Sequence, residues 1–188
     1  MNYSSFPEHI RQTDTVFLGD SLTESFDLLK HFGRSDFRNR GVSGDLTDHV
    51  LYRMEEIINS HPAKVFLMIG INDVYQGYEP DKIISNISKI LNEFKEKSPG
   101  TRLFVQSILP INSHKLFIGT SVNAEIYRIN IKLKSLCESF QAQFLDFHGD
   151  FLNNVGEMDE KFTYDGVHLS KAGYVLWAEL LQDYVIQN

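Results

Sequence analysis

A serine, an aspartate and a histidine with the pattern of a hydrolytic site occur far apart in this chain. Ser21 lies in segment 19–22, Gly-Asp-Ser-Leu, and Asp165 and His168 bound segment 165–168, Asp-Gly-Val-His. A carboxylate three residues before a histidine can accept a hydrogen bond from one imidazole nitrogen, which leaves the other nitrogen as a base for a serine hydroxyl. These residue types predict ester hydrolysis through a covalent acyl-enzyme.

Further residues could donate hydrogen bonds to an oxyanion. Asn72, in the Gly-Ile-Asn-Asp segment 70–73, offers an amide that donates without adding net charge. Gly44 has no side chain, so its N–H can approach a bound carbonyl closely. The N–H of Ser21, where a strand turns into a helix, is a third donor. Asn72 and Gly44 also suit plain turns, and segment 21–24 also matches a helix capping box.

His148 is the rival base, in the Asp-Phe-His-Gly-Asp segment 146–150. Alternating Asp, His and Asp could hold a metal, but three polar groups at a strand end more often mark a solvated loop. Cys137 is the only cysteine, which excludes an intrachain disulfide and a multi-cysteine metal site. Its apolar neighbours predict a buried side chain.

The apolar pattern alternates between short strand-like runs and longer amphipathic helices. Strands are predicted at residues 15–18, 37–42, 65–69, 103–108 and 144–147, and helical faces within 50–58, 83–94, 122–140 and 175–184. Runs that are apolar on both faces suit a parallel sheet covered by helices. The pattern therefore predicts an α/β fold, a three-layer α/β/α sandwich around a five-stranded parallel sheet. The length predicts one domain over 1–188.

Ligands of such folds bind beyond the carboxyl ends of the strands. Segment 19–22, Gly44 and segment 70–73 follow the first three predicted strands in turn. We therefore expect them at one edge of the sheet, which Asp165 and His168, just before the last helix, can also reach.

Composition restricts the partners. The net charge of -7 and the pI of 5.4 argue against nucleic acid, because a phosphate backbone needs clustered Lys and Arg. A mean hydropathy of -0.23 and the lack of a long apolar run predict no membrane span. Residues 1–12 lack the pattern of a signal peptide, so we expect a cytoplasmic location for the chain as given, or a secreted or periplasmic one if a leader has been removed. The sequence does not decide between a monomer and a homo-oligomer.

Taken together, the segments resemble the blocks of the SGNH hydrolases in the GDSL esterase/lipase family. Segment 19–22 matches the block that names the family, Gly44 its glycine block, 70–73 its Gly-x-Asn-Asp block and 165–168 its Asp-x-x-His block. The resemblance runs from about Thr15 to the last helix. It implies a flavodoxin-like sandwich and no metal or organic cofactor.

The resemblance also assigns roles to single residues. Ser21 would be the nucleophile, His168 the base that later protonates the leaving alcohol, and Asp165 the residue that orients it. The oxyanion hole would consist of the N–H groups of Ser21 and Gly44 and the side chain of Asn72.

Residues 39–45 and 50–54 are most similar to the branch related to platelet-activating-factor acetylhydrolase catalytic subunits and carbohydrate O-acetylesterases. This similarity implies small-molecule or glycan substrates with acetyl or other short acyl esters, O-acetylated sugars among them. Alternatives are a lysophospholipase or thioesterase of the same family, a degenerate hydrolase that binds carbohydrate, and a non-catalytic receiver or flavin-binding module on the same sandwich.

Loops are expected to determine the substrate. Leu116, Phe117 and Ile118, in loop 110–120, either wall an acyl or sugar pocket or anchor the loop to the core. Tyr75 either stacks on a sugar or covers its own loop.

Overall fold

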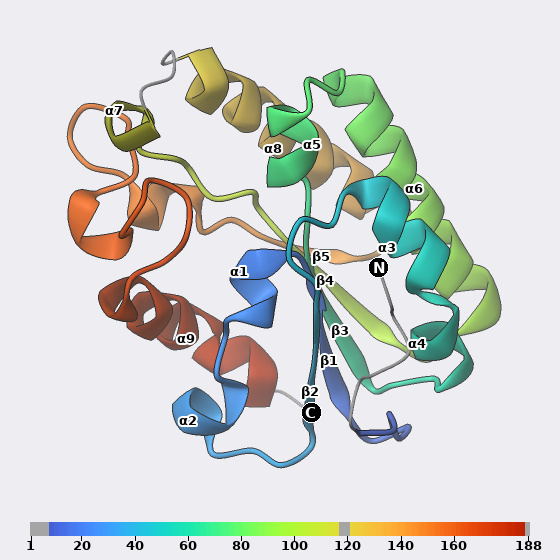
Figure 1. Cartoon of the computed structure of the whole chain (residues 1–188). Helices are drawn as coiled ribbons and strands as arrows, with labels where there is room; N and C mark the ends of the chain where they lie inside the picture. The colour runs from blue at the N-terminus through green and yellow to red at the C-terminus, as the bar shows by residue number, and fades with distance from the viewer. Residues whose placement is uncertain (1–7, 117–120, 187–188) are drawn as a thin grey trace.

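The computed structural model describes residues 8–116 and 121–186 (Figure 1). In this part of the chain, five parallel strands form one sheet in the order β2-β1-β3-β4-β5. The strands are β1 (Thr15–Gly19), β2 (Phe37–Gly41), β3 (Lys64–Met68), β4 (Arg102–Gln106) and β5 (Gln143–Leu145). The predicted α/β sandwich with a parallel sheet is confirmed, and each strand lies within about two residues of its predicted bounds.

Helices cover both faces of the sheet (Figure 1). One layer contains α3 (Thr47–Arg53), α4 (Glu55–Asn59), α6 (Pro80–Lys97) and α8 (Ser121–Phe140), packed on aliphatic strand residues such as Val16 and Leu18. The other contains α1 (Ser21–Glu24), α2 (Leu28–Phe32) and α9 (Lys171–Ile186), packed on strand phenylalanines. Because side chains alternate along a strand, one sheet presents an aliphatic face and an aromatic face.

The aromatic face is a row of stacked rings. Phe66 on β3 lies between Phe17 on β1 and Phe104 on β4, with ring centroids 5.0 and 4.4 Å away. Trp177 of α9 is fully buried here and stacks on Phe26 with a centroid distance of 4.5 Å. These contacts fix α9 against the sheet and the segment that follows α1.

Several short elements were not predicted. The helical face expected across 50–58 is divided between α3 and α4, with buried Met54 at the junction. The helices α2, α5 (Ile71–Tyr75) and α7 (Ser113–Leu116) and the 3₁₀ turns η1 (His148–Phe151) and η2 (Glu160–Phe162) are too short to show a helical period, whereas the helix expected to begin at Ser21 is present as α1. Among the described helices, none combines the length and the apolar character needed to cross a membrane.

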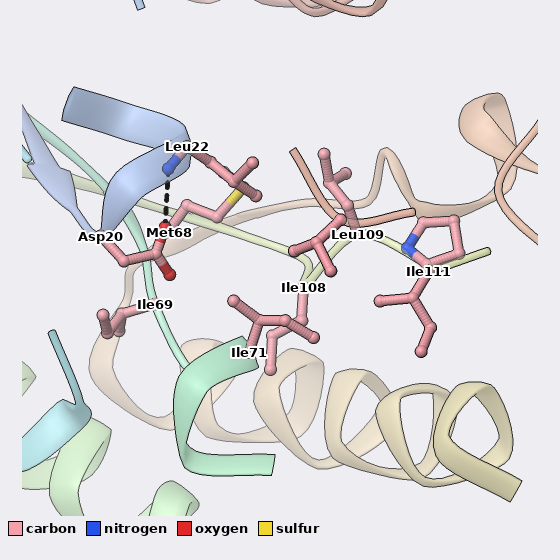
Figure 2. A pocket seen from close by; sticks show the side chains of 10 residues that line it. Asp20, Leu22, Met68, Ile69, Ile71, Ile108, Leu109 and Ile111 are labelled. Atoms are coloured by element: carbon pink, nitrogen blue, oxygen red, sulfur yellow. Dashed lines mark hydrogen bonds between the residues drawn. The ribbon is translucent and has the colours of Figure 1, made fainter. Parts of the chain in front are cut away.

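The first three strands end at the same level of the sheet, since Gly19 pairs with both Gly41 and Met68. Beyond Gly19, Asp20 is the N-cap of α1 and accepts a hydrogen bond from the Leu22 amide at 3.0 Å (Figure 2). The alternative interpretation of 21–24 as a capping box is therefore wrong, because Asp20 caps the helix. Asp20 is 1% exposed, and this burial raises the pKa of its carboxyl to about 7.

The raised pKa of Asp20 predicts a pH-dependent stability that D20N removes. In the unfolded chain Asp20 ionises near its ordinary value of 3.8, whereas in the folded protein it keeps its proton to about pH 7. Unfolding then releases a proton between these values, so the free energy of unfolding falls as the pH rises, by roughly 4 kcal/mol for this group. Asn preserves the cap but does not ionise. We therefore expect the free energy of unfolding of D20N, relative to that of the parent, to increase as the pH rises from 4 to 7.5.

Urea unfolding of both proteins across this pH range measures the difference. The comparison is made between variant and parent because burial also raises the pKa of Asp45 and Asp73. D27N, at the exposed N-cap of α2, is the matched cap variant. A stability difference between D20N and the parent that does not change with pH would contradict the prediction.

Candidate active site

The structure brings Ser21, Asp165 and His168 together, although Ser21 and His168 are 147 positions apart in the chain. Ser21 Oγ lies 3.0 Å from His168 Nε2, and His168 Nδ1 lies 2.6 Å from Asp165 Oδ2. Both distances are within the range for proton transfer along a hydrogen bond. All three side chains are partly exposed, so a substrate can reach them.

Asp165 is held by its own turn. Its Oδ1 accepts hydrogen bonds from the amides of Val167 and His168, at 2.9 and 2.8 Å. Burial pushes the pKa of Asp165 upward, but the hydrogen bonds from the His168 ring and the two amides outweigh it, so the pKa lies below its ordinary value. The carboxylate is therefore ionised at neutral pH and accepts the Nδ1 proton, which leaves Nε2 free to accept a proton from Ser21.

The loop after β4 supports this turn. Gly166 has φ +107°, and a Cβ there would lie 2.8 Å from the Asn112 carbonyl oxygen and from Leu116 Cγ, so only glycine fits. The Asn112 amide donates to the Gly166 carbonyl at 2.8 Å. Leu116 is half-buried, packs against the core and touches the turn, whereas Phe117 and Ile118 lie outside the described residues.

The candidate oxyanion donors follow neighbouring strands. Ser21 is the first residue of α1 after β1, Gly44 lies in the loop after β2, and Asn72 is in α5 after β3. The Asn72 side chain donates to the Asp45 carbonyl at 2.9 Å, which connects α5 to the Gly44 loop. Gly44 has φ +80° and is exposed, and a Cβ there would meet no atom within 4 Å. The Asn72 amide has a second hydrogen for a ligand.

Arg53 is a residue of this site that the sequence reasoning missed. Its guanidinium donates to the carbonyls of Gly19 and Arg40 at 3.0 and 2.8 Å, and its Nε donates to Asp45 at 2.5 Å. Arg53 thereby joins the ends of β1 and β2 to the Gly44 loop. The signal in the sequence was an arginine directly beside the apolar face of Val50 and Met54.

Two more positioning contacts were missed. Tyr174, near the start of α9, donates its hydroxyl proton to the Leu22 carbonyl at 2.9 Å, which joins the helix after His168 to the helix that begins at Ser21. Asp73 is fully buried and accepts from the Thr47 amide at 3.0 Å, which fixes the start of α3 against α5.

His148 does not approach Ser21. It is buried in η1, its Nδ1 lies 3.0 Å from the Ile108 carbonyl, and its amide donates to Ser107. The solvated loop expected at this position is therefore wrong for His148, which links η1 to the segment after β4. No cluster of three or more His, Cys, Asp or Glu able to hold a metal occurs among residues 8–116 and 121–186.

Tyr75 lies in α5 beyond Asn72 and is 41% exposed. Burial of the phenol, assisted by the negative charge of Asp165, raises the pKa of Tyr75 to about 12. The Tyr75 hydroxyl therefore stays protonated at all physiological pH values.

Comparison with known proteins agrees with this geometry. The profile of the GDSL-like Lipase/Acylhydrolase family matches residues 17–176. The chain is 28% identical over 171 residues to the platelet-activating factor acetylhydrolase IB subunit alpha1 of Bos taurus, covering 87% of this chain and 71% of that one.

Solved structures show the same architecture. A Streptococcus pneumonia protein, provisionally described as a platelet activating factor, superposes with a TM-score of 0.85 at 28% identity, over 94% of this chain and 85% of that one. The acetyl xylan esterase AlAXEase has the same fold, with a TM-score of 0.78 at 20% identity over 92% of this chain and 100% of that one. The chain therefore belongs to the GDSL-like lipase/acylhydrolase family and is a carboxylic ester hydrolase.

Proposed function

We propose that Ser21 is the nucleophile of this hydrolase. The observation that carries the proposal is the continuous hydrogen-bonded series from Ser21 Oγ through both ring nitrogens of His168 to Asp165. As Oγ attacks the acyl carbon of the ester, His168 Nε2 takes its proton. The imidazolium then gives that proton to the leaving alcohol, and the acyl group remains on Ser21.

The second half of the reaction uses the same groups. Nε2 removes a proton from a water molecule, the resulting hydroxide attacks the acyl carbon, and the proton passes to Oγ as the carboxylic acid leaves. Asp165 stays ionised and stabilises the imidazolium in both halves, since its pKa lies below the ordinary value.

The oxyanion formed in each half would be bound by the N–H groups of Ser21 and Gly44 and by the Asn72 side chain. Their positions at three adjacent strand ends, connected by Arg53 and by the Asn72 to Asp45 hydrogen bond, support this role. Donors held rigidly before the reaction stabilise a developing charge without reorganisation.

A small apolar cavity next to this site supports acetyl or other short acyl groups. Asp20 and Leu22, on either side of Ser21, line it together with Val167, which precedes His168. Aliphatic side chains from the ends of β3 and β4 converge on the same space (Figure 2), namely Met68, Ile69, Ile71, Ile108, Leu109 and Ile111, with Pro110 completing the wall. Its enclosed volume is about 10 Å³, the room of one water molecule, so a methyl group suits it.

The relatives support the same substrate class. The bovine relative is named an acetylhydrolase, whereas the likeness to the acetyl xylan esterase, at 20% identity, concerns the fold alone. We therefore propose acetyl esters of small molecules or glycans. The lysophospholipase alternative would need room for a long acyl chain outside this cavity, whereas a thioesterase could place a short acyl group in it.

Alanine variants test the catalytic roles. With 4-nitrophenyl acetate, we expect S21A and H168A to lower kcat/KM at least about a thousandfold and D165N up to about ten-thousandfold, because each removes a member of one hydrogen-bonded series. H148A should retain activity, because His148 bonds to the Ile108 carbonyl.

Two further measurements complete this test. S85A, at an exposed serine of α6, is the matched serine control and should hydrolyse the ester at the parental rate. A fluorophosphonate should label Ser21, as located by peptide mass spectrometry. Activity retained by folded S21A would refute the nucleophile assignment.

The cavity predicts the acyl-length profile. On 4-nitrophenyl esters we expect kcat/KM to fall from acetate to butyrate to octanoate, since each added methylene must displace buried side chains. I108V removes one methyl group from the wall and should raise the butyrate-to-acetate ratio several-fold, at a stability cost of about 1 kcal/mol.

I87V is the matched control. Ile87 belongs to the same core layer as Ile108 but does not line the cavity, so this variant should lose comparable stability and keep the parental profile. An octanoate rate equal to the acetate rate in the parent would exclude this cavity as the acyl site.

A further inference from the structure

Tyr164 makes an unusual contact for an exposed residue. Its ring is 67% exposed, yet it lies nearly parallel to the His168 imidazole, with 5.8 Å between ring centroids and 15° between planes. A tyrosine this exposed adds little to the core. The contact therefore bears on the histidine more than on folding.

The backbone fixes this arrangement. The Tyr164 amide and the Thr163 hydroxyl both donate to the His168 carbonyl, at 3.2 and 2.8 Å. The Thr163 hydroxyl also accepts from the Gly166 amide at 2.8 Å. Residues 163–168 thus form a closed turn in which the two rings stack with nearly parallel planes.

The two hydrogen bonds of the His168 ring hold it within its own plane and do little against a tilt of that plane. The bonds to Asp165 and Ser21 lie at Nδ1 and Nε2, in the plane of the imidazole and on opposite sides of it. Such a pair defines an axis about which the ring can turn. An aromatic ring over one face opposes that rotation.

The restraint matters most in the acyl-enzyme. There Ser21 Oγ carries the acyl group and has no proton to share with Nε2, so Asp165 alone would hold the imidazole while Nε2 must meet a water molecule. A parallel aromatic face also favours the imidazolium that forms in both halves of the reaction.

We propose, resting on the proposed function, that Tyr164 is a positioning residue that holds the His168 imidazole for both acylation and deacylation. The ring carries this role, and the phenol hydroxyl does not. Because the same histidine serves both steps, loss of the ring slows both by a similar factor.

Burst kinetics with 4-nitrophenyl acetate separate the two steps. In Y164L we expect acylation and deacylation each to fall roughly ten- to hundredfold, the loss that a small misplacement of a catalytic group produces. Since both rate constants fall together, kcat falls and KM stays within about twofold of the parent. Y164F and Y164W keep an aromatic face and should restore both steps.

Two results would contradict the positioning role of Tyr164. If acylation alone slows, so that KM rises and kcat is unchanged, Tyr164 contacts the leaving alcohol and the positioning role is overturned. Parental rates in Y164L overturn it as well.

Y52L, at an exposed tyrosine of α3, is the matched control. If thermal unfolding shows that Leu at position 164 disturbs the fold, Y164N replaces Y164L. Turnover by S21A in the same assay would instead refute the proposed function.

Discussion

The docking of α9 on the aromatic face of the sheet is the contact on which the candidate active site depends. His168 lies three residues before α9 begins, so its distance from Ser21 follows from where that helix packs. Trp177 fixes the helix by stacking on Phe26 and by donating to Gln106 of β4 at 2.7 Å. A shift of about 1 Å in this packing would separate the His168 imidazole from the Ser21 hydroxyl, although neither residue had changed.

Much of this fold was predictable because its parallel strands are buried on both faces. Triplets with a central phenylalanine recur at 16–18, 65–67 and 103–105. In each of them the phenylalanine faces one side of the sheet and its two aliphatic neighbours face the other. The short helices α2, α5 and α7 were not predictable, because one or two turns show no period, whereas α1 was expected from the turn of strand into helix at Ser21. The break at Met54 was missed because its buried side chain continues the apolar pattern across both helices.

The candidate site was predictable to the level of segments and less so to the level of contacts. Local rules favoured Ser21 as a cap, yet the cap is Asp20 and the Ser21 hydroxyl bonds a histidine at the far end of the chain. No local sequence pattern predicts a hydrogen-bond partner 147 residues away. The same holds for Arg53 and Tyr174, whose acceptors are backbone carbonyls on other elements.

Buried carboxylates accumulate at the catalytic edge. Asp20, Asp45 and Asp73 are almost fully buried, and burial raises the pKa of each. Each accepts a hydrogen bond that fixes a loop end, from Leu22, Arg53 and Thr47 respectively. Burying these carboxyls costs desolvation free energy. The hydrogen bonds that they accept hold three separate turns in one geometry beside Ser21.

The distance along the chain between Ser21 and His168 also has a consequence for biosynthesis. A ribosome makes the hydroxyl-bearing turn early and the imidazole late, and α9 must emerge from the exit tunnel before the two can meet. A partly translated polypeptide without α9 therefore lacks the proposed pair of Ser21 and His168. The proposed pair forms in one step, when α9 packs against the phenylalanine row.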